Sequence, residues 1–239
     1  MGRLFLVSTP IGNLEDITVR AVKTLLSVDR IACEDTRKAG LLVAELKKRY
    51  PFVTVADEKP QSFIRFDDHT EQQHTPEIIE LLKVGKDIAL ISDAGTPLIS
   101  DPGYRLVTAC QSRGFCVIPV PGPTAFVAAL TASGLPADKF MFLGYPPEKD
   151  AHRKKLFENL AHMTRIISTT YIFYCAPHKL DHILEELHDF FGDISISVAR
   201  ELTKQHEEIW TGTLASARAR LSEFRGELVV LLNLTPKKS

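Results

Sequence analysis

Short apolar runs alternate with helical patterns along almost the whole chain. In the first half, strands are predicted at residues 4–7, 30–33, 53–55, 87–91 and 115–120. Helices are predicted between them, at residues 18–27, 36–46, 76–84 and 103–111. Pro76 is expected to begin the third helix, because the first helical position needs no backbone N–H. This βαβα order predicts a mostly parallel sheet that is covered by helices on both faces.

The alternation continues through the second half with different connections. Strands are predicted at residues 140–143, 171–174, 194–199, 208–213 and 228–232. Helices are predicted at residues 123–132, around 156–160, at 180–191 and between the last two strands. We place the domain boundary near residues 118–136, so that residues 1–120 form an N-terminal α/β domain and residues 121–239 a C-terminal α/β domain. The predicted fold class is therefore α/β, with two domains.

Composition limits the class of protein. The chain is 44% apolar and 25% charged, as an ordinary globular protein is. It lacks an apolar run of about 18 residues, and its first apolar run reaches Ser8 too soon for a signal peptide, so we expect a cytoplasmic protein without a membrane partner. A net charge of −1 argues against a broadly basic nucleic-acid surface, although not against a local one. Basic clusters at residues 47–49, 153–155 and 237–238 are each explained most simply as a solvated helix face or terminus.

The four cysteines show no metal-binding spacing. Cys33, Cys110, Cys116 and Cys175 form no CxxC pair, and no histidine pair at zinc-ligand spacing lies near them. The first three lie in apolar runs, where a cysteine is usually a small buried hydrophobic residue. We therefore expect no metal site, and we expect these three side chains in the core.

Two polar loops directly follow predicted strands. Residues 8–13, STPIGN, contain a glycine for a tight turn but neither GxGxxG nor GxxxxGK[ST], the glycine patterns of dinucleotide and phosphate loops. Residues 34–37, EDTR, place three ionisable groups at a strand end, where burial is costly unless the groups are paired. Such groups indicate a functional site, although Asp35 or Thr36 could instead cap the following helix.

The loop at residues 92–103, SDAGTPLISDPG, is the most informative segment of the chain. It follows a predicted strand, which is where open α/β sheets bind ligands. It is longer than a plain strand–helix connection, and its aspartates, glycines and prolines predict a rigid loop that exposes backbone amides and carboxylates. A fourth loop, PVPGPTA at residues 119–125, offers the Thr124 hydroxyl, although its prolines could simply end a strand and begin a helix.

Together these loops resemble one family. The matching segments are residues 9–18, 34–37, 92–103, 121–123, 133–136 and 200–204. They resemble the ribosomal RNA small subunit methyltransferase I family, within the tetrapyrrole methylase superfamily, from residue 4 to about residue 232. The resemblance implies two α/β domains of the class III methyltransferase type, with S-adenosylmethionine in the cleft between them, and usually a homodimer. It also implies 2′-O-methylation of a cytidine ribose in the decoding region of 16S rRNA in the small ribosomal subunit.

The resemblance assigns residues to the cofactor. It implies that Pro10 and the backbone of Ala94, Gly95 and Thr96 line S-adenosylmethionine. The other implied cofactor-binding residues are Asp93, Ile99, Thr124, Ala125, Tyr174, Cys175 and Leu202. On this assignment Cys175 belongs to the cofactor site rather than to the core.

Methyl transfer to a hydroxyl also needs a base, because a ribose hydroxyl is a poor nucleophile until its proton is transferred. Glu34, Asp35 and Asp101 are the candidate bases, and the residue pattern leaves the choice among them open. Arg37 or Lys204 could bind phosphate or tune the base. This chemistry requires no metal.

Several positions depart from the family pattern. Asp67 and Thr70 stand where the family usually has His and Asn, Cys175 where it has Glu, and Lys179 where it has Arg. Lysine lacks the bidentate phosphate geometry of arginine, so the changes bear on RNA binding more than on the cofactor. Two alternatives therefore stay open: a methyltransferase of the same fold that acts on a small molecule such as a tetrapyrrole, and a cofactor-binding protein without activity.

Overall fold

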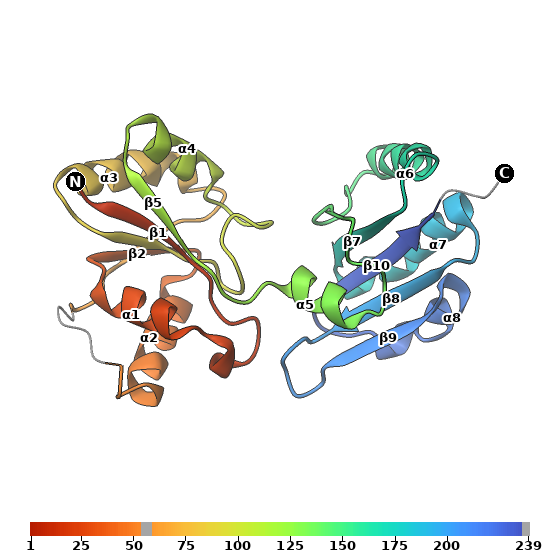
Figure 1. Ribbon diagram of the computed structural model, residues 1–239, viewed down its shortest axis with the longest axis horizontal. Coiled ribbons are helices and arrows are strands. Elements are labelled where there is room, and N and C mark those ends of the chain that lie inside the picture. The colour runs from red at the N-terminus through yellow and green to blue at the C-terminus, as the bar shows by residue number, and fades with distance from the viewer. Residues whose placement is uncertain (54–58, 236–239) are drawn as a thin grey trace. The chain divides into compact units, whose positions relative to one another are not determined.

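The computed structural model describes residues 1–53 and 59–235, and the chain divides into two compact units, Met1–Thr124 and Ala125–Ser239 (Figure 1). The division lies within the predicted boundary region of residues 118–136 and slightly after the predicted domain limit at residue 120. Each unit has its own five-stranded sheet. The architecture is therefore two α/β domains, as predicted.

The first unit contains an entirely parallel sheet with strand order β3-β2-β4-β1-β5. Its strands are β1 (Arg3–Val7), β2 (Arg30–Cys33), β3 (Phe63–Arg65), β4 (Ile88–Leu90) and β5 (Cys116–Val120). Its helices are α1 (Val19–Ser27), α2 (Thr36–Arg49), α3 (Glu71–Lys83) and α4 (Tyr104–Ser112). In a parallel sheet the carboxyl ends of all strands meet at one edge, so the loops after β1, β2, β3, β4 and β5 lie together there.

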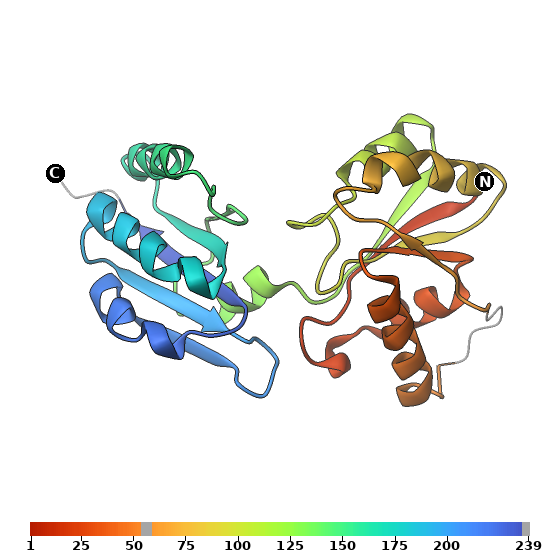
Figure 2. The same cartoon turned by 180° about the vertical axis from the view of Figure 1, so that it is seen from behind.

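Both faces of this sheet are buried, which explains why its strands are continuously apolar rather than alternating. Val7, Ile31 and Ala89 pack in one core cluster with the buried sides of α1 and α2. Leu4, Ala32 and other residues of the same strands pack in a second cluster with α3 and α4. Figures 1 and 2 show the two helix pairs on opposite faces of the sheet.

Two predictions for the first unit differ from the structure. Of the strand predicted at residues 53–55, Val53 lies in an irregular segment, and Thr54 and Val55 lie outside the described residues. The third strand is instead β3, which the sequence did not predict. The predicted start of α3 at Pro76 was wrong, because the helix begins at Glu71 and holds Pro76 in its second turn.

The early start of α3 has a local cause. The Asp67 carboxylate accepts the backbone N–H groups of His69 (3.0 Å) and Thr70 (2.9 Å). This turn fixes the backbone just before the helix, so the first turn forms upstream of Pro76. The Thr70 hydroxyl also bonds the Asp67 carboxylate at 2.9 Å, which closes the turn.

The second unit contains a mixed sheet with strand order β6-β7-β10-β8-β9. Its strands are β6 (Phe140–Phe142), β7 (Thr169–Cys175), β8 (Ser195–Arg200), β9 (Glu208–Thr213) and β10 (Leu228–Leu234). Its helices are α5 (Ala125–Ala132), α6 (Asp150–Thr164), α7 (Leu180–Phe191) and α8 (Leu214–Ala219). Only the β6–β7 pair of this described sheet is parallel; the other three pairs are antiparallel.

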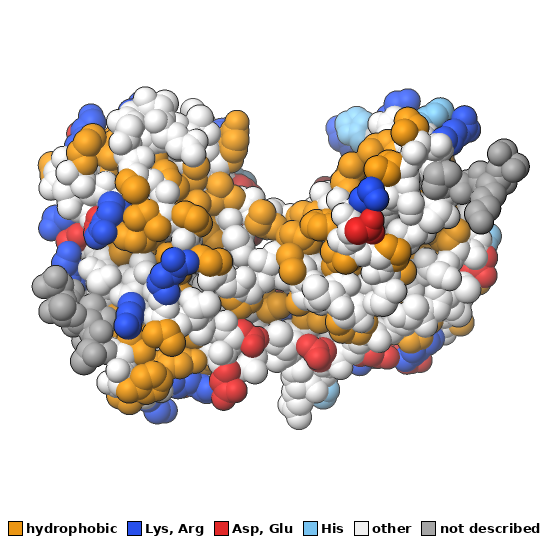
Figure 3. Space-filling model, viewed as in Figure 1, with side chains coloured by type: hydrophobic (Ala, Val, Ile, Leu, Met, Phe, Trp, Pro, Cys, Tyr) orange, Lys and Arg blue, Asp and Glu red, His pale blue; other side chains and the backbone are white. Residues whose placement is uncertain are grey.

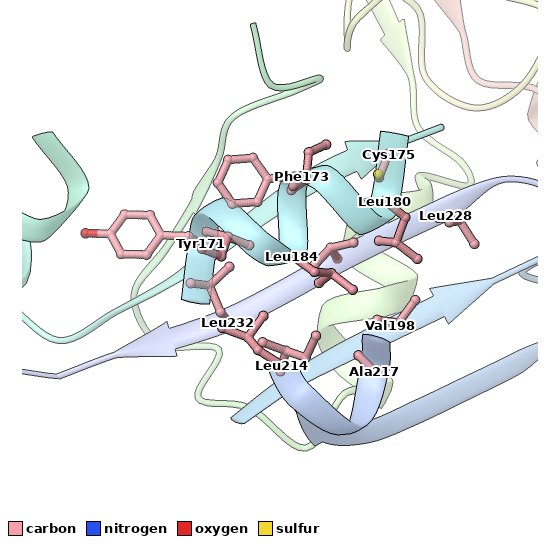
Figure 4. Packing of buried hydrophobic residues seen from close by; sticks show 14 of the residues in the cluster. Tyr171, Phe173, Cys175, Leu180, Leu184, Val198, Leu214, Ala217, Leu228 and Leu232 are labelled. Carbon is pink, nitrogen blue, oxygen red and sulfur yellow. The ribbon is translucent and has the colours of Figure 1, made fainter. Parts of the chain in front are cut away.

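One apolar cluster forms the core of this unit. It contains Tyr171 and Phe173 of β7, Leu184 of α7 and Leu214 of α8 (Figure 4). Because side chains alternate along a strand, Ile172 and Tyr174 face the other side of the sheet, on which α5 packs against β7 and β10. The two sides of the sheet are thus covered by different helices.

The cysteines divide between core and surface. Cys33 and Cys110 are buried as predicted, whereas Cys116 is exposed. The prediction for Cys116 was wrong because it begins β5, an edge strand of the sheet, opposite the exposed residue Arg3. Among the described residues, no helix is long and apolar enough to cross a membrane.

Candidate functional site

The loop after β4 is joined to the loop after β1 by paired backbone hydrogen bonds. The Thr9 N–H donates to the Gly95 carbonyl at 2.8 Å, and the Gly95 N–H donates to the Thr9 carbonyl at 3.1 Å. Gly95 has a φ of +90°, and a Cβ there would lie 3.3 Å from the Ile11 side chain. Glycine is needed here both for the backbone conformation and for the close approach of the loops.

A group of hydroxyl side chains connects these two loops to the loop after β5. Thr96 Oγ1 lies 2.9 Å from Ser8 Oγ and 2.7 Å from Thr124 Oγ1, and it donates to the Pro123 carbonyl at 3.1 Å. The Thr9 hydroxyl donates to the Ser92 carbonyl at 3.2 Å. We call Ser8, Thr9, Thr96 and Thr124 the hydroxyl cluster. It fixes the ends of β1, β4 and β5 relative to one another.

The structure therefore brings together most of the cofactor-binding residues predicted in the first unit. Gly95, Thr96 and Thr124 hold the loops in place, whereas Asp93 and Ala94 are exposed at the loop surface. The remaining two, Pro10 and Ile99, are half-buried in the same loops. A fixed loop with an exposed tip is suited to bind a ligand without an ordering cost.

The second half of the loop after β4 has a strained backbone, and close packing and hydrogen bonds fix its conformation. Leu98 (φ +73°) and Ser100 (φ +64°) adopt the left-handed conformation that residues other than glycine rarely adopt. Gly103 has a φ of +133°, and a Cβ there would lie 2.7 Å from Leu90 Cδ2. The buried Glu71 carboxylate accepts the N–H groups of Gly103 (3.0 Å) and Arg105 (3.1 Å) at the start of α4. These contacts determine where Asp101 lies.

Carboxylates gather beyond the ends of β2, β3 and β4. We call Glu34, Asp68, Asp93 and Asp101 the acidic cluster. Glu34 Oε1 accepts the Asp93 N–H at 3.1 Å, and the Lys38 ammonium lies 2.6 Å from Asp93 Oδ2. Glu34, Asp68 and Asp93 all act electrostatically on Asp101. Lys38 offsets part of this negative charge.

The acidic cluster shifts the pKa of two predicted bases. Burial, followed by the negative charge of Glu34, raises the pKa of Asp101 to about 6, although a hydrogen bond from Ser92 opposes the shift. Burial and the charges of Asp93 and Asp68 also raise the pKa of Glu34 above its ordinary value. Asp101 thus titrates close to neutral pH, which is where a general base is most effective.

Asp35 and Arg37 occupy different surroundings. Asp35 caps α2, since its Oδ1 accepts the N–H groups of Arg37 (2.8 Å) and Lys38 (3.4 Å). These backbone hydrogen bonds, the one from Arg37 foremost, lower the pKa of Asp35. The Arg37 side chain is 92% exposed and lies 3.9 Å from Asp35. The capping alternative therefore explains Asp35, and the catalytic roles of both residues stay predictions.

The predicted cofactor residues of the second unit lie at the end of β7, in the loop after β8 and at the start of α5. Cys175 is buried in the apolar core cluster of this unit (Figure 4), so the expectation that it lies outside the core was wrong; burial raises the pKa of its thiol to about 12, and it is a neutral thiol. The Tyr174 ring contacts Phe142 with ring centroids 4.8 Å apart. Leu202 is buried between Glu201 (φ +48°) and Thr203 (φ +65°), two further residues in the left-handed conformation. Ala125 is the first residue of α5.

Lys204 binds two carboxylates of its own unit. Its ammonium lies 3.0 Å from Glu201 Oε1 and 2.9 Å from Glu227 Oε2. Partial burial opposes the charge, but the hydrogen bonds to Glu227 and Glu201 raise the pKa of Lys204 overall. Glu201 Oε1 also accepts the Glu227 N–H at 3.0 Å. Lys204 is thus charged, and its ion pairs connect the loop after β8 to the turn before β10. Its catalytic role stays a prediction.

Four residues of the site were missed or left without a role by the sequence analysis. Asp68 follows β3, a strand that was not predicted. Glu71 directly follows Thr70, one of the positions that depart from the family pattern, and was given no role. Lys38 lies one helical turn after Glu34, a spacing that could have indicated it, and Ser8 directly follows β1. The roles of Asp68 and Glu71 can be recognised only when the strand order is known.

Comparison with known proteins gives a consistent result. A family model for tetrapyrrole (corrin/porphyrin) methylases matches residues 3–218. Ribosomal RNA small subunit methyltransferase I of Synechocystis sp. is 45% identical, over 99% of this chain and 81% of its own length. The protein of the same name is 43% identical in Haemophilus influenzae, over 99% of this chain and 80% of its own. In Thermotoga maritima it is 39% identical, over 98% of this chain and 99% of its own.

Solved structures share the fold. Diphthine synthase aligns with a TM-score of 0.69 at 12% identity, covering 97% of this chain and 90% of its own. The methyltransferase CobJ aligns with a TM-score of 0.68 at 19% identity, covering 97% and 93%. Uroporphyrin-III C-methyl transferase from Thermus thermophilus, complexed with S-adenyl homocysteine, aligns with a TM-score of 0.64 at 19% identity, covering 96% and 97%. The predicted fold class and the predicted family resemblance are confirmed.

Proposed function

Because the chain belongs to the tetrapyrrole (corrin/porphyrin) methylase family, and within it to the ribosomal RNA small subunit methyltransferase I family, we propose that it methylates small-subunit rRNA. The methyl donor is S-adenosylmethionine, and the acceptor is the ribose 2′-oxygen of a cytidine in the decoding region of 16S rRNA. The observation that carries this proposal is identity of 39–45% to relatives of that name over 98–99% of the chain. The enzyme acts in the cytoplasm, where ribosomes are, and as a homodimer.

The hydroxyl cluster and the loop it fixes suit the cofactor. S-adenosylmethionine carries polar groups along its length, and the exposed residues Asp93 and Ala94 offer backbone and carboxylate partners beside the buried Gly95. Pro10, Ile99, Thr124 and Ala125 supply further wall residues of this site. We also propose Tyr174, Cys175 and Leu202 as cofactor-binding residues. When bound, the cofactor supplies an electrophilic methyl group.

Asp101 is the base that we assign. Asp35 is engaged as the cap of α2, and Glu34 accepts the Asp93 N–H. Asp101 has a pKa of about 6, so it is mostly ionised at pH 7 yet still basic enough to accept a proton. Asp101 would accept the proton of the 2′-hydroxyl as its oxygen bonds the methyl carbon and the methyl–sulfur bond of the donor breaks. The negative charges of Glu34 and Asp68 raise the pKa of the Asp101 carboxylate.

The test is mass spectrometry of nucleosides from 16S rRNA of a strain that lacks the gene, before and after complementation. Loss and return of one 2′-O-methylcytidine is the expected result. Purified protein with S-adenosylmethionine and undermethylated 30S subunits should restore the same nucleoside in vitro. An unchanged nucleoside profile would contradict rRNA as the acceptor.

The same assay separates the two alternatives. A small-molecule acceptor is favoured by the match to tetrapyrrole methylases and by the net charge of −1, and it predicts methyl transfer to a tetrapyrrole but none to 30S subunits. A protein without activity predicts cofactor binding with transfer to neither acceptor. Methylation of 30S subunits alone would exclude both.

A further inference from the structure

The outer face of α6 is rich in cations. Lys154, Lys155 and Arg165 are exposed, as are Lys149 just before the helix and the histidines at 152 and 162. The opposite side of the helix carries Phe157 and Leu160, which pack into the core, and the buried Arg153. Figure 3 shows Lys, Arg and His side chains gathered over α6 at the outer rim of this unit. We call Lys149, Lys154, Lys155 and Arg165 the α6 cationic face, and His152 and His162 lie on the same helix.

Most of this positive charge is not neutralised within the chain. Among the residues that the structure describes, only Lys155 of the α6 cationic face forms an ion pair, with Glu158 at 3.3 Å. Cations elsewhere are commonly paired, as Arg3 is with Asp87 and Arg200 with Glu208. The chain as a whole has a net charge of −1, so the positive excess on α6 is local.

The remaining cation of α6 has a different role. The Arg153 guanidinium is buried, and it binds the Glu186 carboxylate of α7 at 3.1 Å as well as Asp150 at 2.8 Å. It also donates to the carbonyls of Pro147 (2.9 Å) and Glu148 (3.1 Å). Arg153 thereby fixes α6 to α7 and to the preceding turn. The outward cations consequently project from a firmly held helix.

We propose that the α6 cationic face binds phosphates of the rRNA backbone. The face extends from residue 149 to residue 165, about 24 Å at 1.5 Å per helical residue, which is long enough to follow several successive phosphates. Lysines bind phosphate as point charges without reading the sequence, so this surface supplies affinity and orientation rather than base specificity. The inference rests on the proposed function and adds a docking surface outside the residues assigned to methyl transfer.

The experiment uses a triple charge reversal, Lys154→Glu, Lys155→Glu and Arg165→Glu, in the full chain. We expect the KM for 30S subunits to rise about tenfold or more, with kcat and the Kd for S-adenosylmethionine unchanged. The salt dependence of subunit binding should also become shallower, by roughly one unit of log K against log salt for each phosphate that the variant no longer binds. The matched control reverses Arg20, Lys23 and Lys48, three exposed cations of α1 and α2 in the first unit.

A neutral triple variant, Lys154→Gln, Lys155→Gln and Arg165→Gln, covers the case in which the charge reversal misfolds, and it should raise the KM by a smaller factor. Filter binding of 16S rRNA without S-adenosylmethionine tests the surface even if no methylation is found. If the wild-type chain binds rRNA but methylates none, the proposed reaction fails while this surface is still measurable. Equal rRNA affinity of the wild type, the neutral variant and the control would overturn the inference.

Discussion

The hydroxyl cluster and the acidic cluster lie at the same edge of the same parallel sheet, yet they satisfy their polar groups in opposite ways. In the hydroxyl cluster, neutral groups at the ends of β1, β4 and β5 bond one another, as Thr96 does with Ser8 and Thr124. In the acidic cluster, four carboxylates beyond β2, β3 and β4 share one lysine, Lys38, which pairs with Asp93. The first arrangement stabilises the fold, and the second works against it.

The difference indicates separate roles. Mutually satisfied neutral groups give rigidity at little electrostatic cost, which suits a pocket wall. Like charges that raise one another's pKa are unfavourable for folding and are typical of functional sites. We therefore assign the hydroxyl cluster to binding of the cofactor and the acidic cluster to turnover. Substitutions in the two clusters should then affect different kinetic constants.

The largest effect is expected for Asp101→Asn. The substitution keeps the size of the side chain but removes its basicity, so we expect kcat to fall about 100-fold or more. The Kd for S-adenosylmethionine, measured by titration calorimetry, should stay within about twofold. Asp35→Asn is the matched control, because asparagine caps a helix as well as aspartate does and turnover should be nearly unchanged. Similar losses in both variants would remove the distinction between Asp101 and Asp35.

Thr96→Val tests the hydroxyl cluster. It removes the hydroxyl that joins the β1, β4 and β5 loops and leaves the buried Ser8 hydroxyl without that bond, which costs about 1–3 kcal/mol of unfolding free energy. We expect the Kd for S-adenosylmethionine to rise about tenfold, while kcat at saturating cofactor changes little. Thr108→Val, on the exposed side of α4, is the control. A fall in kcat with unchanged cofactor affinity would assign the cluster to turnover instead.

The arrangement that supports these predictions was only partly accessible from the sequence. Periodicity correctly predicted α7, β9 and most other elements, because each has a local apolar pattern. It missed β3, whose three residues form a strand only through pairing with β2. Pro76 was misleading because the turn at Asp67 and Thr70 starts α3 upstream of it.

The candidate site, like the fold, could be predicted only in part from the sequence. The loops at residues 34–37 and 92–103 were recognised as polar segments after strands, and Asp101 was named as one of three possible bases. The raised pKa of Asp101 could not be predicted, because Glu34 and Asp68 approach it only through the strand order β3-β2-β4. In the same way, the ion pair of Lys204 with Glu227 depends on the pairing of β8 with β10.

Because the Glu34 charge raises the pKa of Asp101, a smaller effect is expected on the pH dependence of turnover. Turnover should rise with pH as Asp101 loses its proton, with a midpoint near its pKa of about 6. The Glu34 charge raises that pKa, so Glu34→Gln should move the midpoint to lower pH and increase relative turnover at pH 5. The measurement is kcat/KM for 30S subunits against pH for both proteins at saturating cofactor, because this ratio reports the pKa values of the enzyme before the acceptor binds. A midpoint that moves upward would mean that the two carboxylates are not coupled in this way.

The smallest expected effect is on stability. Asp101→Asn should stabilise the fold although it lowers activity. The folded-state pKa of Asp101, about 6, is above the value of about 3.9 expected for an unfolded chain. Ionisation of Asp101 therefore destabilises the fold progressively from about pH 4 to pH 6, and the full cost is present above pH 6.

Asp101→Asn removes this cost, so the variant should be more stable than the wild type at pH 7.5 and nearly equal to it at pH 4. Since Asp101 is partly exposed, we discount the shift to about 1 kcal/mol, which corresponds to about 2–4 °C in Tm. Thermal unfolding of both proteins at the two pH values measures this difference. A variant that loses turnover and also loses stability at pH 7.5 would show that Asp101 is a structural residue, and the contrast between the two clusters would then fail.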